Sequence, residues 1–344
     1  MSHTRLLADL RGADAASFGG KSAALGELIA AGIPVPPGFG LSTSAYRAFV
    51  EAAGLGGLIA TTMSRVDPDD VDTVGAASHA IGEAMRSAPV PGAVRDEIAA
   101  RYEELGEPPV AVRSSALGED SREATFAGQQ ETYLWVRGAD AVCDAVRDCW
   151  VSLYGPPAIS YRARLAEIEP AMGVAVQLMV DAEVSGVMFT CNPVSGDPSM
   201  VAINASWGLG LAVVGGEVTP DDYLVSKVTR EVVREHVHEK QVEYVPDAEG
   251  RGAVRVEVPE ERRARPCLDQ PLVEALVEVA RRVERYFGSA QDIEWAIARG
   301  VELPTSLFIL QTRPVTTQPR AAKSKPTSAL SLLMSTFGAD KEDG

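Results

Sequence analysis

The sequence predicts an α+β fold, because helical patterns occupy its first third and strand patterns dominate the rest. Between residues 18 and 32, a turn is followed by apolar residues at helical spacing, and Gly32 marks a stop. Between residues 269 and 287, an apolar stripe runs along a longer amphipathic pattern, with Asp269 as its N-cap and Gly288 as its stop.

The remaining elements follow in chain order. Helices are expected at 44–53 and, on either side of Pro89 and Pro91, within 67–105. From residue 109 the character changes to strands with one helix between them. The expected elements are strands at 110–113, 130–136, 173–180, 185–190 and 200–205, a helix at 139–153, and strand-like segments with turns over 224–258. A polar loop is expected at 114–124, and 318–344 has the composition of a linker or tail.

Composition limits the classes of partner. The chain has 344 residues, enough for more than one domain, and a net charge of −16. Such a field disfavours nucleic acid and anionic membranes as partners, and any nucleotide site must supply local positive charge. No signal peptide or apolar run of membrane-spanning length is present, so a cytoplasmic protein is expected. The 4 cysteines have no CxxC spacing and are interpreted as reduced, mostly buried thiols.

A pair of strand-like segments near the C-terminal end is the most informative feature. Alternation along 291–296 puts Asp292 and Glu294 on one face, and alternation along 308–314 puts Gln311 and Arg313 on one face. If a hairpin brings these faces together, two carboxylates, an amide oxygen and a guanidinium converge. Such oxygens suit Mg²⁺, and a guanidinium suits phosphate. The alternative is an ordinary cross-strand ion pair.

Two cations earlier in the chain are candidates for phosphate contacts. Lys21 follows two glycines at a predicted helix N-terminus, where free amides favour an anion. The segment is not a P-loop, because the GxxxxGK pattern needs glycine where Ala15 stands. The alternative is a surface lysine after a turn. Arg113 ends a buried-looking strand, where an arginine needs a fixed partner, either a carboxylate or a phosphate.

Three further segments are weaker signals taken singly. Gly128 follows a polar loop and would let backbone approach a ligand, although most such glycines simply make turns. A glycine-rich loop at 207–216 follows a strand. The strand end at 177–180 offers the backbone groups and apolar wall that an adenine needs, or is simply a core strand.

Taken in order, these segments resemble one family across nearly the whole chain. The chain resembles the ATP-binding domain shared by phosphoenolpyruvate synthase, pyruvate phosphate dikinase and rifampin phosphotransferase. The segments that carry the resemblance are Phe18-Gly19-Gly20-Lys21, Val112-Arg113-Ser114-Ser115-Ala116, Thr125-Phe126-Ala127-Gly128-Gln129, Gly186-Val187-Met188-Phe189-Thr190, Gly208-Leu209-Gly210, Gly216-Glu217-Val218-Thr219-Pro220-Asp221, Asp292-Ile293-Glu294-Trp295 and Gln311-Thr312-Arg313-Pro314.

The resemblance implies an ATP-grasp-type module of two lobes, with an N-terminal lobe at 1–180, a C-terminal lobe at 181–317 and a tail at 318–344. It also implies roles for individual residues in binding ATP and Mg²⁺. By resemblance, the phosphates are held by Lys21, Arg113 and Arg313, which also form the catalytic set, and the loop that covers the phosphates contains Gly128, Gln129 and Thr132. The adenine slot is lined by Gln177, Met179 and Val180, and the glycine-rich loop contributes Gly210. The Mg²⁺ ligands are Glu294 and Gln311.

The implied function is the phosphate-donating half of a dikinase reaction, in which ATP becomes AMP. The phosphate would pass to a histidine on a partner domain or chain and then to a small-molecule acceptor, since no histidine here has the family's Thr-Ser-His-Ala context. Leu211 stands where the family often has a glutamate that contacts ribose. That departure keeps open a nucleotide-binding regulatory or scaffold subunit without turnover. A direct ATP-grasp ligase that makes an acyl phosphate and ADP is a third reading.

Overall fold

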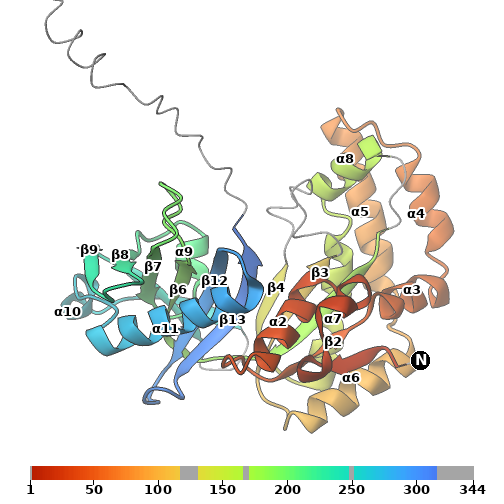
Figure 1. The fold of residues 1–344 in the computed structure, drawn as a ribbon. Helices are drawn as coiled ribbons and strands as arrows, with labels where there is room; N and C mark the ends of the chain where they lie inside the picture. Colours follow the sequence, from red (N-terminus) through yellow and green to blue (C-terminus); the bar gives the residue numbers. More distant parts are fainter. Residues whose placement is uncertain (1, 117–130, 166–169, 248–251, 316–344) are drawn as a thin grey trace, which may run out of the picture.

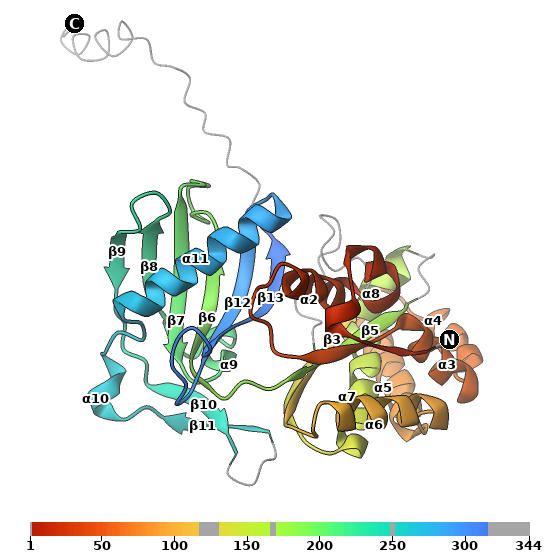
Figure 2. The same ribbon diagram turned by 60° about the horizontal axis from the view of Figure 1, so that its bottom comes forward.

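The computed structural model describes residues 2–116, 131–165, 170–247 and 252–315. Within these ranges two large antiparallel sheets lie side by side (Figures 1 and 2). The first sheet has the strand order β1-β2-β5-β3-β4, and the second has the order β13-β12-β6-β7-β8-β9. The strands of the first sheet are β1 (Thr4–Leu6), β2 (Gly38–Leu41), β3 (Val110–Ala116), β4 (Thr132–Val136) and β5 (Met172–Leu178).

The second sheet is built from the C-terminal half of the chain. Its strands are β6 (Ala182–Phe189), β7 (Met200–Trp207), β8 (Asp221–Ser226), β9 (Val232–His236), β12 (Gln291–Ala298) and β13 (Leu307–Pro314). A separate two-stranded ladder joins β10 (Val242–Pro246) to β11 (Ala253–Glu257).

Helices cover one face of each sheet. Those that gather on the first sheet and beyond it are α3 (Thr43–Ala52), α4 (Gly56–Met63), α5 (Val71–Ser87), α6 (Gly92–Glu104), α7 (Ala139–Ser152) and α8 (Pro156–Leu165). The second sheet is crossed by α11 (Gln270–Phe287), as Figure 2 shows. The shorter helices are η1 (Leu7–Asp9), η2 (Gly12–Asp14), α1 (Ala15–Phe18), α9 (Leu211–Val214) and α10 (Glu260–Arg263), and α2 (Gly20–Ala30) lies between the sheets.

Alternation in β3 divides its side chains between two environments. Val110 and Val112 are fully buried in the core that the first sheet forms with its helices, where Phe49 stacks on Trp150 with ring centroids 5.2 Å apart. Arg113 therefore projects from the opposite face. The helical cover thus leaves the other face of β3 available to the second sheet.

The core of the second sheet draws on both ends of the chain. Ile293, Trp295 and Ile309 of the final hairpin pack in one cluster with the apolar stripe of α11. The same cluster contains Leu25 and Leu28 of α2. The division at 180/181 therefore separates the two large sheets, but residues from both sides of it share the core of the second sheet.

Most expected helices form within a few residues of the expected bounds. The predicted caps of α11 are confirmed, since the Asp269 carboxylate accepts from the Leu272 amide at 3.0 Å and Gly288 adopts a left-handed φ of 69°. The prediction that 114–116 begins a loop is wrong, because β3 continues through Ala116 in register with β5. The prediction missed α4, α8, β1 and β2, which are short or lack a clear apolar period.

Asp221, the last residue of the Val-Thr-Pro-Asp segment, forms a buried cluster of hydrogen bonds. It is fully buried, and its Oδ1 accepts from Lys240 Nζ at 2.5 Å and from the His238 amide at 2.9 Å. Its other oxygen accepts from the Cys267 amide at 2.8 Å. This cluster ties β8 to the segments before β10 and before α11, far from the final hairpin in sequence. We therefore assign Asp221 to stability rather than to chemistry.

All four cysteines, Cys143, Cys149, Cys191 and Cys267, are buried and free, as expected. Burial raises the pKa of the Cys143 thiol to about 11, which suppresses the reactive thiolate.

Candidate functional site

The final hairpin has the geometry that alternation predicts. In the antiparallel pair of β12 and β13, Asp292 lies opposite Arg313 and Glu294 lies opposite Gln311. Arg313 Nε donates to Asp292 Oδ2 at 2.8 Å. The ion-pair reading of the hairpin is thus correct for Asp292 and Arg313, whereas Glu294 has a different partner.

That partner is Arg113, from the other sheet. Its Nη2 donates to Glu294 Oε2 at 2.6 Å and to Gln311 Oε1 at 2.9 Å. Its Nη1 donates to the Leu310 carbonyl at 2.9 Å. A planar guanidinium can satisfy three acceptors at once only when they converge, so the hairpin and β3 are fixed against each other here.

A β-bulge in β13 supplies the third acceptor. The ladder pairs Glu294 with Gln311 but Trp295 with Ile309, so Leu310 is the extra residue and has no partner in β12. Such a residue leaves its backbone groups free for other contacts. The Leu310 carbonyl uses this freedom to accept from Arg113.

Charges around Glu294 outweigh its burial. Burial raises the pKa of the Glu294 carboxyl, but Arg113, through its charge and hydrogen bond, and then the charges of Lys21 and Arg313, bring that pKa below its usual value. Glu294 therefore stays ionised at neutral pH, and 38% of its side chain is exposed. The pKa of Asp292 is instead raised, mainly by burial, against the opposing effect of Arg313.

Lys21 is buried rather than a surface residue, so the surface alternative is wrong. Its side chain is 5% exposed, and Nζ donates to the Ser114 carbonyl at 2.9 Å. Gly19 makes this placement possible, because it has a φ of 82° and a Cβ there would lie 2.0 Å from the Ser115 carbonyl oxygen. The start of α2 is therefore seated directly on β3, beside Arg113.

Unpaired buried hydrogen-bond donors near Arg113 indicate that a ligand binds there. Arg113 Nε and the hydroxyls of Ser22 and Ser114 are buried and have no hydrogen-bond partner among the described residues. A native protein rarely leaves such groups unpaired. Ser114 follows Arg113 in β3, so its hydroxyl points to the opposite face of the sheet. The unpaired Arg113 N–H, on the face of the hairpin, fits an oxygen of a phosphate, so this residue fits a phosphate-bearing ligand.

The other predicted site residues divide into two groups. Thr132 lies directly opposite Arg113 in the pairing of β3 with β4, so their side chains share a face. Gly128 and Gln129 lie outside the described residues.

Two of the predicted adenine residues, Met179 and Val180, lie at the junction of the sheets. Met179 and Val180 join Leu209 and Leu310 in a small apolar cluster between the two sheets. The Met179 amide donates to the Pro109 carbonyl at 2.9 Å. The Gln177 side chain is 2% exposed and lies 3.4 Å from the Pro36 carbonyl, so it is a core residue within β5.

The glycine-rich loop approaches the same junction from the second sheet. Gly208 has a φ of 70°, and a Cβ there would lie 2.5 Å from the Tyr244 carbonyl. Gly210 precedes α9, and Leu211 begins that helix with 36% of its side chain exposed. Leu211 also lines a cavity of about 530 Å³ together with β4, including Thr132.

Sequence reasoning missed three features of this site: two contacts and one β-bulge. It did not pair Arg113 with Glu294, it did not foresee the bulge at Leu310, and it did not identify Ser114 as the acceptor for Lys21. A signal for the first was present, because a buried arginine and an exposed carboxylate both lacked partners in their own segments. The other two depend on backbone geometry that side-chain patterns do not encode.

A comparison with protein-family models is decisive here. Residues 15–332 match the model described as the pyruvate phosphate dikinase, AMP/ATP-binding domain. The chain belongs to this family. ATP or AMP binding is the property that the description of this domain family names.

Several curated proteins similar to this chain are described as phosphoenolpyruvate synthases or probable phosphoenolpyruvate synthases. The chain is 39% identical to the probable phosphoenolpyruvate synthase of Methanocaldococcus jannaschii over 93% of its own length and 27% of that protein. It is 40% identical to the probable phosphoenolpyruvate synthase of Methanothermobacter thermautotrophicus, over 95% of this chain and 48% of that protein. It is 39% identical to the phosphoenolpyruvate synthase of Pyrococcus furiosus, over 88% of this chain and 42% of that protein. The chain thus spans less than half the length of these relatives.

A solved structure from Pyrococcus horikoshii Ot3 aligns at 12% identity over 71% of this chain and 89% of that chain, with a TM-score of 0.32, which is too low to indicate a shared fold. Within the part of the chain that the structure describes, no helix is long and apolar enough to cross a membrane. The same part holds no cluster of three or more His, Cys, Asp or Glu side chains arranged for a metal ion.

Proposed function

We propose that this chain is the ATP-binding, phosphate-donating component of a dikinase-type phosphotransferase. The observation that carries the proposal is the convergence of Arg113, Glu294 and Gln311 from two sheets, with Lys21 beside them. Phosphoryl transfer depends on positioning and charge neutralisation more than on covalent chemistry by the protein. Three cations, Lys21, Arg113 and Arg313, close to an ionised carboxylate suit that task.

Each side chain has a role in this proposal. Arg113 and Lys21 hold the polyphosphate, and Arg313 contacts the transferring phosphoryl group. Glu294 and Gln311 are the protein ligands of Mg²⁺, which when bound would neutralise phosphate charge. Two oxygen ligands from the protein suit Mg²⁺, since this ion takes its remaining ligands from water and substrate phosphates. Thr132 and the segment with Gly128 and Gln129 cover the phosphates.

Arg113 is shared between two sets of acceptors in this proposal. In the ligand-free arrangement its Nη2 is occupied by Glu294 and Gln311, while its buried Nε has no partner among the described residues. A bound phosphate oxygen can take Nε without breaking the contacts that join the sheets. The arginine then positions the nucleotide and holds the hairpin at the same time.

The junction of the sheets provides the base-binding region. Met179, Val180 and Leu209 form its apolar wall, and Gly210 follows Leu209 in the chain. With this assignment, the two lobes at 1–180 and 181–317 form an ATP-grasp-type module with the nucleotide between them.

The reaction breaks the bond between the β-phosphorus and the oxygen that bridges to the α-phosphate, and AMP leaves with that oxygen. A histidine nitrogen of a partner domain or chain forms the new bond to the β-phosphorus, and the γ-phosphate passes to water or inorganic phosphate. None of the 4 histidines here has a Thr-Ser-His-Ala context, so the acceptor histidine belongs to a partner. A small-molecule acceptor then takes the phosphate from that partner.

The test is an assay with Mg-ATP and a purified phosphohistidine domain from a relative. AMP, inorganic phosphate and phosphohistidine are the expected products, measured by chromatography and phosphorus NMR. The same assay without the histidine domain is the control and should give little AMP. Production of ADP alone, with or without the partner, would contradict the dikinase reaction and favour an ATP-grasp ligase.

Leu211 favours a second candidate, a nucleotide-binding regulatory or scaffold subunit. The side chain at the start of α9 is apolar where the family often offers a ribose acceptor. Calorimetry separates the two candidates: tight ATP binding with no AMP, even with the partner present, supports the scaffold.

A further inference from the structure

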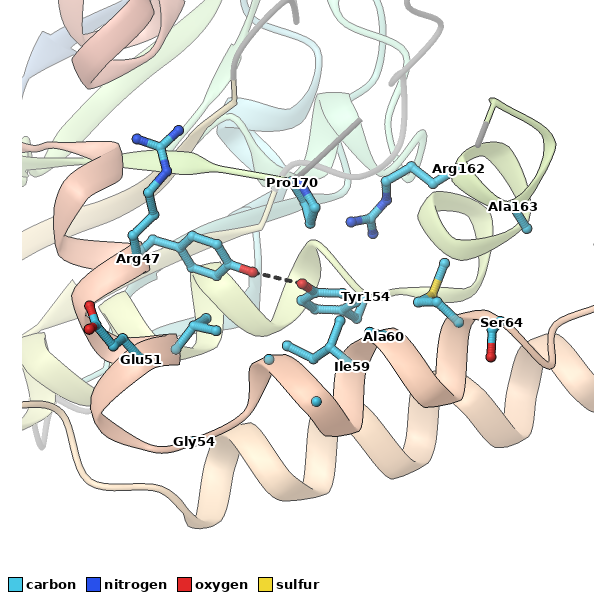
Figure 3. A pocket seen from close by; sticks show the side chains of 15 residues that line it. Arg47, Glu51, Gly54, Ile59, Ala60, Ser64, Tyr154, Arg162, Ala163 and Pro170 are labelled. Carbon is cyan, nitrogen blue, oxygen red and sulfur yellow. Dashed lines mark hydrogen bonds between the residues drawn. The ribbon is translucent and has the colours of Figure 1, made fainter. Parts of the chain in front are cut away.

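A second cavity lies among helices of the N-terminal half, apart from the hairpin site. It has a volume of about 1010 Å³, at the upper end of the roughly 300–1,000 Å³ typical of ligand pockets. Its lining comes from α3, α4 and α8 and from Tyr154, which follows α7 (Figure 3). The predicted nucleotide residues that the structure describes do not contribute to it, so the proposed phosphate chemistry leaves it without a role.

Arg162 of α8 places a desolvated positive charge in this cavity. Its guanidinium lies over the Tyr154 ring, 4.8 Å from the centroid, and points into the space between Tyr154 and Pro170 (Figure 3). Nε donates to the Ala158 carbonyl at 3.1 Å and the side chain is also hydrogen-bonded to Tyr154, but Nη2 is buried and has no hydrogen-bond partner among the described residues. Burial lowers the pKa of the Arg162 guanidinium, but not enough to remove its charge at neutral pH.

No carboxylate among the described residues forms an ion pair with Arg162. The contrast with Arg164 on the same helix is informative, because Arg164 is exposed and yet pairs with Asp69 at 2.6 Å. A buried, unpaired charge is costly, whereas an exposed one is not. The stacking and hydrogen bond with Tyr154 and the bond to Ala158 satisfy part of the guanidinium, and an anion in the cavity would satisfy Nη2.

The rest of the lining indicates the kind of anion. The hydroxyls of Tyr46 and Tyr154, both of which line the cavity, lie 2.7 Å apart and form a polar floor, and the Arg162 guanidinium lies over the Tyr154 ring (Figure 3). Val50, Ile59 and Met63 make an apolar wall. A small polar floor beside a wider apolar wall suits a ligand with one polar end and one apolar body.

The charge count favours a monoanion. Arg47 and Glu51 also belong to the lining, but their charged ends point away from the Arg162 guanidinium (Figure 3). Among the described residues of the lining, one cation therefore faces the polar floor. A phosphate dianion would need a second cation there, while a carboxylate is matched by one guanidinium in charge and in planar geometry.

We propose that the cavity between α3, α4 and α8 is a binding site for an organic monocarboxylate with a small apolar body. Its carboxylate contacts Arg162 Nη2 above the tyrosine pair, and its body lies against the apolar wall of α3 and α4. This site is separate from the nucleotide site and does not depend on the function proposed for it.

The experiment is calorimetric titration of the full chain with four probes of stated chemistry: hexanoate, hexanol, acetate and inorganic phosphate. Hexanoate is expected to bind saturably with one site per chain. Hexanol lacks the charge and acetate lacks the apolar body, so each is expected to bind about 10-fold or more weakly. Equal binding of hexanol, or stronger binding of phosphate, would overturn the assignment to a carboxylate.

Variants locate the site. Arg162→Met is expected to weaken hexanoate about 10- to 100-fold while the melting temperature is kept, because no ion pair is broken. Arg164→Gln, on the same helix and outside the cavity, is the matched control and should bind as the wild type does. Unchanged hexanoate affinity in Arg162→Met would overturn the proposal.

If Arg162→Met does not fold, a second variant tests whether hexanoate binds in this cavity. Ala60 is exposed and lines the cavity, so Ala60→Trp fills the space without touching the core. Loss of hexanoate binding in a folded Ala60→Trp protein supports the site. Retained binding, or no saturable binding of hexanoate to the wild type, refutes it.

Discussion

Arg113 and Glu294 are 181 positions apart in the chain, yet Nη2 of the arginine lies 2.6 Å from Oε2 of the glutamate. This contact joins the first sheet to the final hairpin across the proposed nucleotide site. It has a structural effect and, in our proposal, a chemical one. The two effects can be separated because 38% of the Glu294 side chain is exposed, while only 12% of the Arg113 side chain is.

Glu294→Gln tests the chemical effect. The amide keeps an oxygen for Arg113 but loses the charge that binds Mg²⁺, so we expect ATP turnover with the histidine partner to fall about 100-fold or more. The free energy of unfolding should change by less than ~1 kcal/mol, since the pair is partly exposed. Glu235→Gln on exposed β9 is the control. A loss of folded protein in Glu294→Gln would show that the carboxylate is mainly structural.

Arg113→Lys tests the structural effect. A lysine keeps the charge but cannot donate in one plane to Glu294, Gln311 and the Leu310 carbonyl. We expect the free energy of unfolding in urea to fall by about 1–3 kcal/mol and kcat/KM to fall as well. Arg299→Lys, whose arginine has a looser pair with Asp181 at 3.6 Å, is the matched control. Full activity in Arg113→Lys would refute the role of the planar guanidinium.

Leu211→Glu tests the departure from the family pattern. The residue begins α9, where a negative charge is compatible with the helix dipole, so the variant should fold. If the position contacts ribose, the Kd for ATP measured by calorimetry should fall several-fold, as a hydrogen bond worth about 1 kcal/mol would give. Val214→Glu, exposed on the same helix, should leave the Kd unchanged. No gain in Leu211→Glu would place the ribose elsewhere.

The neighbouring residues Asp221 and Asp222 provide a direct test of burial. Asp221→Asn leaves the buried ammonium of Lys240 without its counter-ion, and we expect a loss of about 3–5 kcal/mol in unfolding free energy. Asp222→Asn disrupts a partly exposed pair with Arg234 and should cost less than ~1 kcal/mol. Equal costs in urea unfolding would contradict the structural role of Asp221.

Glu97 predicts a specific dependence of stability on pH. Burial raises the pKa of its carboxyl, but hydrogen bonds from Ser2, His3 and Thr4 bring the folded-state pKa below the ordinary value. The stabilisation is therefore present above that ordinary pKa and is lost as the pH falls through the folded-state pKa.

Glu97→Ala should accordingly be less stable than the wild type at pH 7. The difference should shrink as the solution is acidified below about pH 4, as followed by urea unfolding at several pH values. Glu103→Ala, exposed on the same helix, is the control and should show a smaller difference at every pH. A constant difference for Glu97→Ala would indicate lost packing instead of titration.

Local patterns were enough to predict much of the fold. The caps at Asp269 and Gly288, the alternation around Glu294 and the proline break between α5 and α6 depend on neighbouring residues, and the sequence displays them directly. In contrast, α4 has three small or flexible residues among its eight and no buried stripe, so no local pattern indicated it.

The site was predictable only in part for a related reason. The register of Asp292 with Arg313 and of Glu294 with Gln311 follows from alternation within one hairpin. The approach of Arg113 and Lys21 depends on how two sheets meet, which no local pattern records. Their joint assignment to a phosphate site came from the family resemblance, and their roles remain predictions.

The shared core has a consequence for how the protein is made. Leu25 and Leu28 leave the ribosome long before Ile293 and Ile309, with which they are finally buried. The apolar side of α2 therefore stays exposed to solvent, or bound by a chaperone, until the last hairpin has been synthesised. Cutting the chain between the two sheets would leave each fragment with an uncovered apolar surface, so we expect that neither half folds as an independent unit.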